Sequence, residues 1–197
     1  MSDIFEVRWH GRGGQGAKTA ALLFGDAIMS TGKYFQAFPE YGPERMGAPV
    51  QAFNRSSAEP ITMHCGIKEP RVVVILDPTL METQPVTEGL KADGIILVNT
   101  NASADSLRQK LKLTNQKICT VDASGISREL LGKELPNTPM LGALVRVTDV
   151  IGIDDLIKFV EKTLGKKFRG KPEVIKGNID SIRRAYDEVK VTDGGGK

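Results

Sequence analysis

A chain of 197 residues has the length of one compact domain with a sizeable core. Apolar residues make up 40% and charged residues 26%, an ordinary globular composition. The net charge is only +3, and basic residues are not interleaved with aromatic ones, so we expect no nucleic-acid partner. No stretch approaches the ~20 apolar residues of a membrane span, so we expect no membrane insertion.

The two cysteines and the first residues predict a cytoplasmic protein. Cys65 and Cys119 lie far apart and outside any CxxC motif, so we expect free thiols. The opening MSDIFEVRW lacks the basic and apolar regions of a secretion signal. An iron–sulfur cluster conventionally uses four thiolates, so the two cysteines of this chain are too few to ligate one. No other pattern in the sequence predicts a metal site.

The first third of the chain combines alternating segments with one amphipathic helix. Apolar residues recur at helical spacing from Ala17 to Ile28, and Gly32 is a plausible stop. The Pro- and Gly-rich segment 39–49 predicts a loop. Alternation predicts strands at 4–9, 34–38 and 50–54.

Three later runs of consecutive apolar residues predict buried strands. They are 72–76, 95–98 and 118–121. Such runs are typical of strands whose two faces both lie under helices. Asp77-Pro78, Asn99 and Asp122 follow these runs with turn-forming residues.

The last third is predicted to be helical. One helix has Pro139 in its first turn, a second spans 153–164, and a third spans 175–189. We therefore expect an α/β fold, with a Rossmann-like, mainly parallel or mixed sheet flanked by helices and a helical C-terminal third. The predicted boundaries are one domain at 1–190 and a disordered tail at 191–197.

A glycine-rich turn between the first strand and the first helix is the main candidate site. It matches GxGxxG, and Lys18 and Thr19 follow in the first helical turn. Glycines let an anionic group approach the backbone, and a helix N-terminus favours negative charge. Ala17 breaks the P-loop register, so ATP hydrolysis is not expected. The candidate binding residues are Gly11, Arg12, Gly13, Gly14, Gln15, Gly16, Lys18 and Thr19.

This turn leaves three interpretations open. It binds an anion or nucleotide, it serves an interface, or its glycines only allow tight packing of helix on strand. Glu40 follows the second predicted strand, about where a dinucleotide-binding unit places its ribose-binding acid. However, no recognisable substrate domain with a catalytic His or Lys follows.

Two long segments together resemble the γ subunits of the 2-oxoacid:ferredoxin oxidoreductase family, the pyruvate enzymes most of all. They are RWHGRGGQGAKTAALLFGDA at 8–27 and FPEYGPERMGAPVQAFNRSS at 38–57. An LDP triplet at 76–78 and NTPMLGA at 137–143 extend the resemblance. Met46 departs from the pattern, since a second arginine is expected after Arg45.

The resemblance implies a heteromeric enzyme in which this chain has no catalytic residue. The family decarboxylates a 2-oxoacid on thiamine diphosphate, passes electrons through iron–sulfur clusters to ferredoxin, and transfers the acyl group to coenzyme A. Asp93-Gly94 and Asn99 do not reproduce the family's thiamine-diphosphate motif. The resemblance therefore implies that these cofactors reside in α-, β- and δ-type partner subunits. This chain is left with a structural role and, through the glycine turn, a candidate share of coenzyme A binding.

The YGPERMGAP loop has its own alternatives. Tyr41, Glu44 and Arg45 are the candidate residues for docking against partner subunits, because aromatic and arginine side chains often anchor interfaces. Ligand contact and an ordinary surface loop remain open for this segment. The alternative for the whole chain is a free-standing nucleotide-binding module or a small NAD(P)-dependent oxidoreductase.

Overall fold

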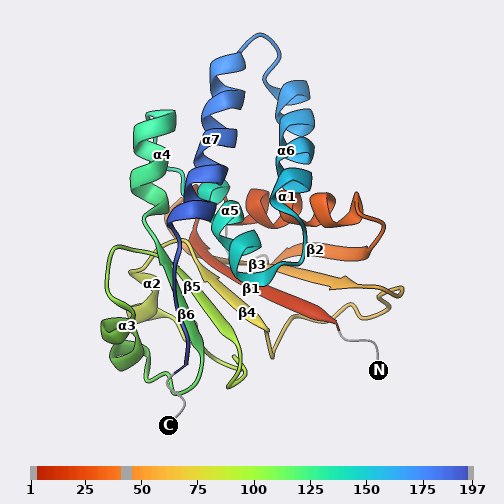
Figure 1. Ribbon diagram of the computed structural model, residues 1–197. Helices are drawn as coiled ribbons and strands as arrows, with labels where there is room; N and C mark the ends of the chain where they lie inside the picture. Colours follow the sequence, from red (N-terminus) through yellow and green to blue (C-terminus); the bar gives the residue numbers. More distant parts are fainter. Residues whose placement is uncertain (1–3, 41–45, 195–197) are drawn as a thin grey trace.

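In the computed structural model, which describes residues 4–40 and 46–194, one seven-stranded sheet carries helices on both faces (Figure 1). The strand order is β2-β3-β1-β4-β5-β6-β7. The strands are β1 Phe5–Arg12, β2 Tyr34–Glu40, β3 Pro49–Ser57, β4 Val72–Ile75, β5 Ile95–Asn99, β6 Lys117–Val121 and β7 Lys190–Thr192. The helices are α1 Ala17–Met29, α2 Leu80–Thr83, α3 Ala104–Leu111, α4 Ala123–Leu131, α5 Asn137–Thr148, α6 Ile153–Lys167 and α7 Pro172–Glu188.

The sheet is mixed, which confirms the predicted fold class. Strands β1, β4, β5 and β6 run parallel, and β3 lies antiparallel between β1 and β2. The prediction of a disordered tail from residue 191 is wrong at its start. Val191 and Thr192 belong to β7, which pairs antiparallel with β6. A three-residue edge strand is too short for a periodic signal, so the sequence pattern does not predict β7.

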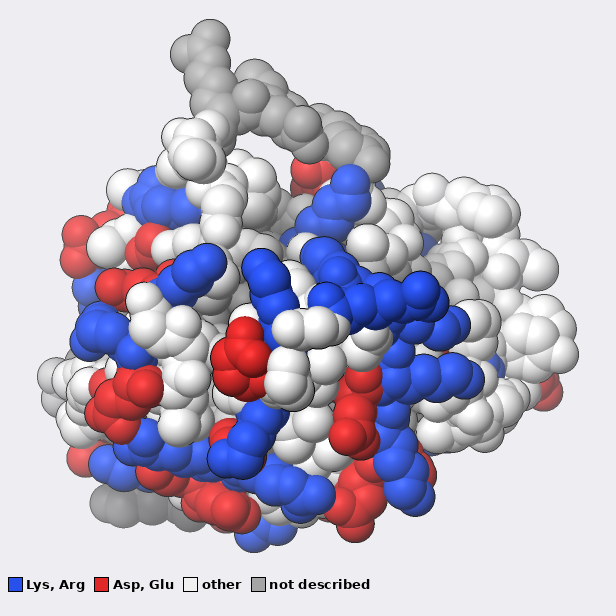
Figure 2. All heavy atoms as spheres, turned by 90° about the horizontal axis from the view of Figure 1, so that it is seen from above, with Lys and Arg blue, Asp and Glu red and all other residues white. Residues whose placement is uncertain are grey.

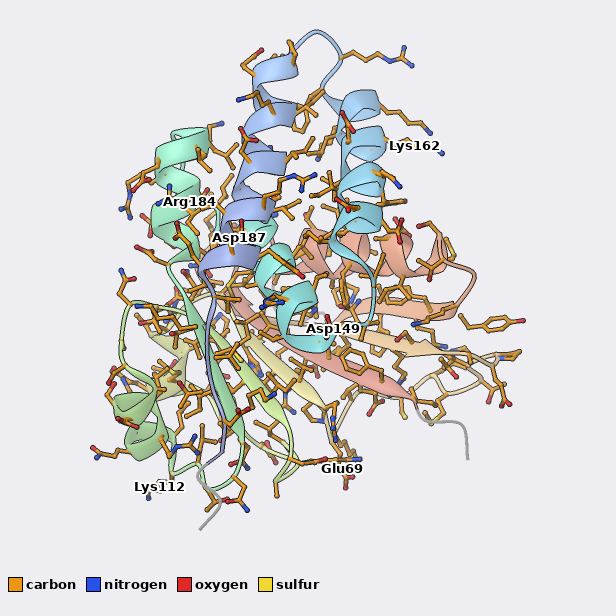
Figure 3. The ribbon with its side chains drawn as sticks, in the orientation of Figure 1. Glu69, Lys112, Asp149, Lys162, Arg184 and Asp187 are labelled. Carbon is orange, nitrogen blue, oxygen red and sulfur yellow. The ribbon has the colours of Figure 1, made fainter. Side chains whose placement is uncertain are left out.

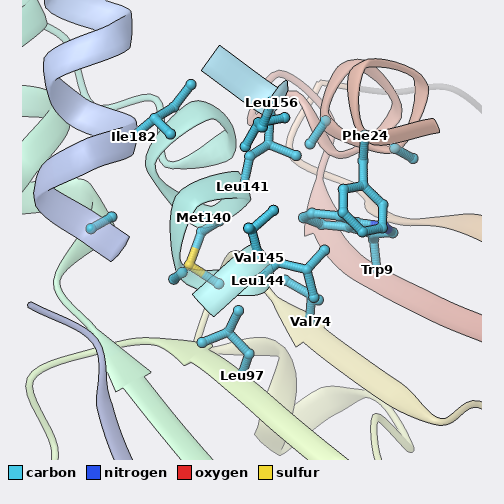
Figure 4. Packing of buried hydrophobic residues seen from close by; sticks show 14 of the residues in the cluster. Trp9, Phe24, Val74, Leu97, Met140, Leu141, Leu144, Val145, Leu156 and Ile182 are labelled. Carbon is cyan, nitrogen blue, oxygen red and sulfur yellow. The ribbon is translucent and has the colours of Figure 1, made fainter. Parts of the chain in front are cut away.

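The central strands are buried on both faces, as their unbroken apolar runs predicted. Val72 and Val74 of β4 pack into the main core, while Val73 and Ile75 pack into a second core on the opposite face. Trp9, Phe24 and Leu144 meet in the main core (Figure 4). The Trp9 indole forms a buried hydrogen bond, in which its Nε1 donates to Asn54 Oδ1 at 2.7 Å. Such a partner removes most of the cost of burying the indole N–H.

The two faces of the sheet are covered unequally (Figure 1). Helices α1 and α4 to α7 lie on one face, and the short helices α2 and α3 lie on the other beside β4 to β6. Among the described residues, no helix covers this second face of β1, β3 and β2. Because strand side chains alternate, Glu6, Arg8 and His10 of β1 share that face.

Several helix boundaries depend on single capping residues rather than on apolar periodicity. Helix α4 begins where Asp122 Oδ1 accepts from Gly125 N at 2.8 Å. Helices α3 and α5 end at Lys112 and Asp149, whose φ angles of 53° and 51° lie in the left-handed region (Figure 3). Local caps of this kind stop a helix without leaving a periodic pattern. The periodicity of apolar residues therefore did not predict α3 and α4.

Basic residues concentrate toward the end of the α6–α7 hairpin. The connector after α6 contains Arg169 and Lys171, both exposed. Lys162 projects from α6 into solvent (Figure 3). Seen from this side, Lys and Arg side chains lie interspersed with Asp and Glu (Figure 2). Mixed charge of this kind is typical of a solvated face.

Helices α5 and α7 approach so closely that a glycine is required between them. A Cβ at Gly142 would lie 2.0 Å from the carbonyl oxygen of Ile182. We expect Gly142→Ala to lower the free energy of unfolding by about 1–3 kcal/mol, because α7 would have to move away. Urea denaturation measures this change.

Gly165→Ala in α6 is the matched control. A Cβ there meets nothing within 4 Å. We expect this substitution to be neutral or to stabilise by up to ~1 kcal/mol through helix propensity. Equal midpoints for the two variants would contradict the close α5–α7 approach.

Candidate functional site

The glycine turn lies where the sheet reverses its order of connection. After β1 the chain passes through α1 to β2 on one side of the sheet, whereas β5 and β6 follow β4 on the other side. The carboxyl ends of the parallel strands β1 and β4 therefore meet at a topological switch point. Ligands of open α/β sheets bind characteristically in the crevice at such points.

Two of the glycines are required by the backbone. Gly14 and Gly16 have φ angles of 98° and 81°, in the left-handed region that favours glycine. Gly16 is the N-cap of α1, and its carbonyl accepts from Ala20 N at 2.9 Å. A Cβ at Gly16 would also lie 2.7 Å from Asn137 Nδ2, so the N-termini of α1 and α5 converge here.

The two segments that carried the sequence resemblance contact each other. Gly13 N donates to the carbonyl oxygen of Ala48 at 2.9 Å, and Gly47 N donates to that of Gly13 at 3.1 Å. Met46, 92% exposed, lies beside Gly14. Tyr41, Glu44 and Arg45, the predicted docking residues, lie outside the described residues.

The Arg12 guanidinium is engaged in hydrogen bonds within the protein. Its Nε donates to Asp77 Oδ2 at 3.1 Å and its Nη2 to Thr79 Oγ1 at 2.8 Å. Its Nη1 donates to the carbonyl oxygen of Gly47 at 3.1 Å. The guanidinium therefore holds the turn against β4 and the 46–48 segment, which makes Arg12 a positioning residue.

Gln15 completes this network from inside the turn. Its Nε2 donates to Asp77 Oδ2 at 2.8 Å, and its Oε1 accepts from Arg12 N at 2.8 Å. Burial alone would raise the pKa of Asp77, but hydrogen bonds from Thr79 and Gln15, together with the charge of Arg12, lower it overall. Asp77 is therefore an anion at the centre of the turn.

Lys18 and Thr19 complete the predicted set on the exposed side of α1. Sequence reasoning missed Asp77, Thr79 and Asn137, which the fold brings to the same turn. The LDP and NTPMLGA segments were the available signals, but they indicated turns and a helix start rather than contacts with residues 11–16.

Glu40 does not occupy the position of a ribose-binding acid. It ends β2, and β3 lies between β2 and β1. In a dinucleotide-binding unit the second strand is the direct neighbour of the first, so that its acid reaches the ribose. The inserted strand removes this argument for NAD.

His10 and Arg8 form a buried pair on the second face of β1. His10 Nε2 accepts from Arg8 Nε at 3.0 Å. Burial and the adjacent Arg8 charge lower the pKa of His10 to about 3, so the ring is neutral. Arg8 Nη2 donates to the carbonyl oxygens of Val86 at 3.1 Å and Glu88 at 2.5 Å.

The cysteines match their predicted roles as free thiols. Cys119 is buried in β6, where burial raises its pKa to about 12, and Cys65 is exposed. In the described part of the chain, no three His, Cys, Asp or Glu side chains gather as metal ligands. Within the same residues, no helix is both long and apolar enough to cross a bilayer.

Comparison with known proteins gives matches along nearly the whole chain. The family model for pyruvate ferredoxin/flavodoxin oxidoreductase matches residues 6–188. The pyruvate synthase subunit PorC of Thermotoga maritima is 49% identical over 189 residues, with 96% of each chain covered. The common γ subunit of the pyruvate/ketoisovalerate oxidoreductases of Pyrococcus abyssi is 44% identical, covering 95% of this chain and 98% of that one.

A solved structure agrees in fold over the same length. The crystal structure of the PORC subunit of pyruvate oxidoreductase from Thermotoga maritima superposes with a TM-score of 0.84 at 44% identity. The match covers 96% of this chain and 99% of that one.

The Asp77 network predicts a stability change. We expect Asp77→Asn to lower the free energy of unfolding at pH 7 by about 1–3 kcal/mol, because Arg12 and Gln15 lose a charged acceptor. Since the folded pKa of Asp77 is depressed, its contribution is present above about pH 4 and is lost as the pH falls through the folded pKa. Urea denaturation at pH 7 and at pH 3 measures both effects.

Asp93→Asn serves as the control, because Asp93 forms an exposed ion pair with Arg71. Exposed pairs contribute little, so this variant should denature like the wild type at both pH values. Equal losses for the two variants at pH 7 would contradict the role given to Asp77.

The burial of His10 predicts a second, separate pH dependence of the free energy of unfolding. The folded ring titrates at about 3, whereas an unfolded histidine titrates near 6.5. The unfolded state therefore binds one more proton between these values, and stability falls by about 1.4 kcal/mol per pH unit as the pH drops through that window. His10→Gln should remove this slope, while His64→Gln, at an exposed position, should keep it. An unchanged slope in His10→Gln would refute the assignment.

Proposed function

Because the chain belongs to the pyruvate ferredoxin/flavodoxin oxidoreductase family, we propose that it is the γ-type subunit of a heteromeric pyruvate:ferredoxin oxidoreductase. The complex converts pyruvate, coenzyme A and oxidised ferredoxin into acetyl-CoA, carbon dioxide and reduced ferredoxin. The carrying observation is the end-to-end match with a pyruvate synthase subunit at 49% identity. The free-standing nucleotide-binding module is not favoured, since the relatives are subunits of the same length.

The residues of this chain support a division of labour with its partners. Its two cysteines lie in separate places, one buried in β6 and one exposed after β3, and two thiolates do not complete a cluster. We assign the thiamine diphosphate and the iron–sulfur clusters to α-, β- and δ-type subunits, with ferredoxin as an indirect partner. In this arrangement the γ-type subunit supplies architecture, and the complex works in the cytoplasm.

The glycine turn is proposed to contribute to coenzyme A binding. Gly14 and Gly16 have no side chains, so the backbone at the start of α1 is open to an approaching ligand. Lys18 and Thr19 are exposed in the next turn. Helix N–H groups and an ammonium suit a pyrophosphate or a 3′-phosphate. Arg12 is committed to Asp77 and Thr79, so its part is to hold the turn in place.

The loop that carries Tyr41, Glu44 and Arg45 is proposed to dock against the catalytic subunits. The support is its attachment, because Gly47 and Ala48 directly after it pair with Gly13. Docking through this loop would bring the glycine turn to the same subunit boundary.

Reconstitution tests the proposed function. Coexpressed with the neighbouring α-, β- and δ-type chains, this protein should copurify with them and support pyruvate-dependent reduction of ferredoxin. A complex assembled without it should lose most activity. Full activity without this chain, or activity only with other 2-oxoacids, would overturn the assignment.

Substitution at Gly14 tests the coenzyme A role. We expect Gly14→Ala to raise the KM for coenzyme A by at least about tenfold in the assembled complex, with the KM for pyruvate unchanged, because a side chain at φ 98° strains the turn. Gly32→Ala is the matched control, since Gly32 also has positive φ but its Cβ would meet nothing within 4 Å. An unchanged coenzyme A KM in a fully assembled Gly14→Ala complex would exclude this role.

A further inference from the structure

A small pocket lies on the face of β1 opposite α1. Its volume is about 180 Å³, and its polar lining residues are His10, Glu40, Gln51 and Gln84. Leu80 of α2 contributes an apolar wall. Since one water occupies about 30 Å³ of liquid, the pocket holds about six waters or a molecule of similar size.

His10 presents an unused hydrogen-bond donor to this pocket. Because Nε2 accepts from Arg8, the proton of the neutral ring is on Nδ1. No described residue accepts from Nδ1, although His10 as a whole is only 2% exposed. Among the described residues, only Gln36 Oε1 and Arg55 Nη1 are fully buried side-chain atoms that lack a hydrogen-bond partner. His10 Nδ1 is not one of them. Since it also has no acceptor, it retains contact with the open space of the pocket.

Arg8 gives the pocket a positive background. Its hydrogen bonds go to an imidazole nitrogen and two backbone carbonyls, none of which carries a charge. Arg55 on the same face, in contrast, has the carboxylate of Glu6 at 2.7 Å from its Nε. The Glu88 carboxylate acts on Arg8 only through space. A buried guanidinium without a directly bonded anion favours a negative charge nearby.

We propose that this pocket binds a small monocarboxylate, with one carboxylate oxygen accepting from His10 Nδ1–H. The amides of Gln51 and Gln84 line the same space and can donate to the second oxygen. Glu40 is the acidic residue of the lining, and its exposed position at the rim sets a repulsive limit on affinity. A 2-oxoacid of about six heavy atoms has the size and charge required, but the chemistry applies to any small monocarboxylate.

Nuclear magnetic resonance on the full-length chain tests the site directly. With ¹⁵N-labelled histidine at pH 7 and constant ionic strength, the Nδ1–H resonance of His10 is followed during titration with acetate, pyruvate, phenylpyruvate and acetamide. We expect saturable shifts with acetate and pyruvate, and none with acetamide or the bulky phenylpyruvate. Absence of saturation with both small acids, or equal binding of acetamide, would overturn the proposal.

Substitutions in the lining separate this site from binding elsewhere. Glu40→Gln should tighten pyruvate binding several-fold by removing the rim charge, and His10→Phe should weaken it at least tenfold. Gln51→Ala, at a half-buried position, serves if His10→Phe does not fold, and it should weaken binding by a smaller factor. Unchanged affinity in Glu40→Gln and in the folded variants would place the binding outside this pocket. The assay uses the isolated chain and no turnover, so its failure leaves the proposed subunit function untouched.

Discussion

The contact between Arg12 and Asp77 joins the two halves of the sheet at the carboxyl ends of β1 and β4. Arg12 ends β1 and Asp77 follows β4, so the pair closes the point at which the sheet reverses its connections. Gln15 and Thr79 share the same carboxylate, and Gly47 shares the same guanidinium. A turn rich in glycine is entropically costly to order. This network fixes its shape before any ligand or partner arrives, which is the requirement for a preorganised site.

The side chains of β1 alternate between the two faces of the sheet and so lie in two different environments. Val7 and Trp9 point into the main core, where α1 and α5 cover them. Arg8 and His10 point to the opposite face, where residues of the 84–90 segment meet them instead of a long helix. The glycine turn and the His10 pocket therefore lie at the same end of one strand but on different sides of the sheet. A single strand can thus present side chains of different chemistry to the two candidate sites.

Sequence patterns predicted the fold where many residues repeat one physical signal. The buried runs such as Val72–Ile75 and the long helices α1, α6 and α7 carry periodicity over several turns or a complete strand. Helix α4 and strand β7 depend on a single cap or a three-residue pairing, which periodicity does not record. For the site, the glycines were visible as a motif. The partners Asp77, Thr79 and Asn137 were not, because contacts between segments more than sixty residues apart arise only from the topology.

The late position of β7 constrains the order in which the chain can fold. Residues 172–192 supply both α7, which covers α5 at Gly142, and the strand that pairs with the edge of β6. A nascent chain that has not reached them exposes an apolar helix face and an unpaired strand, both of which promote aggregation. Completion of the domain therefore waits for its final segment.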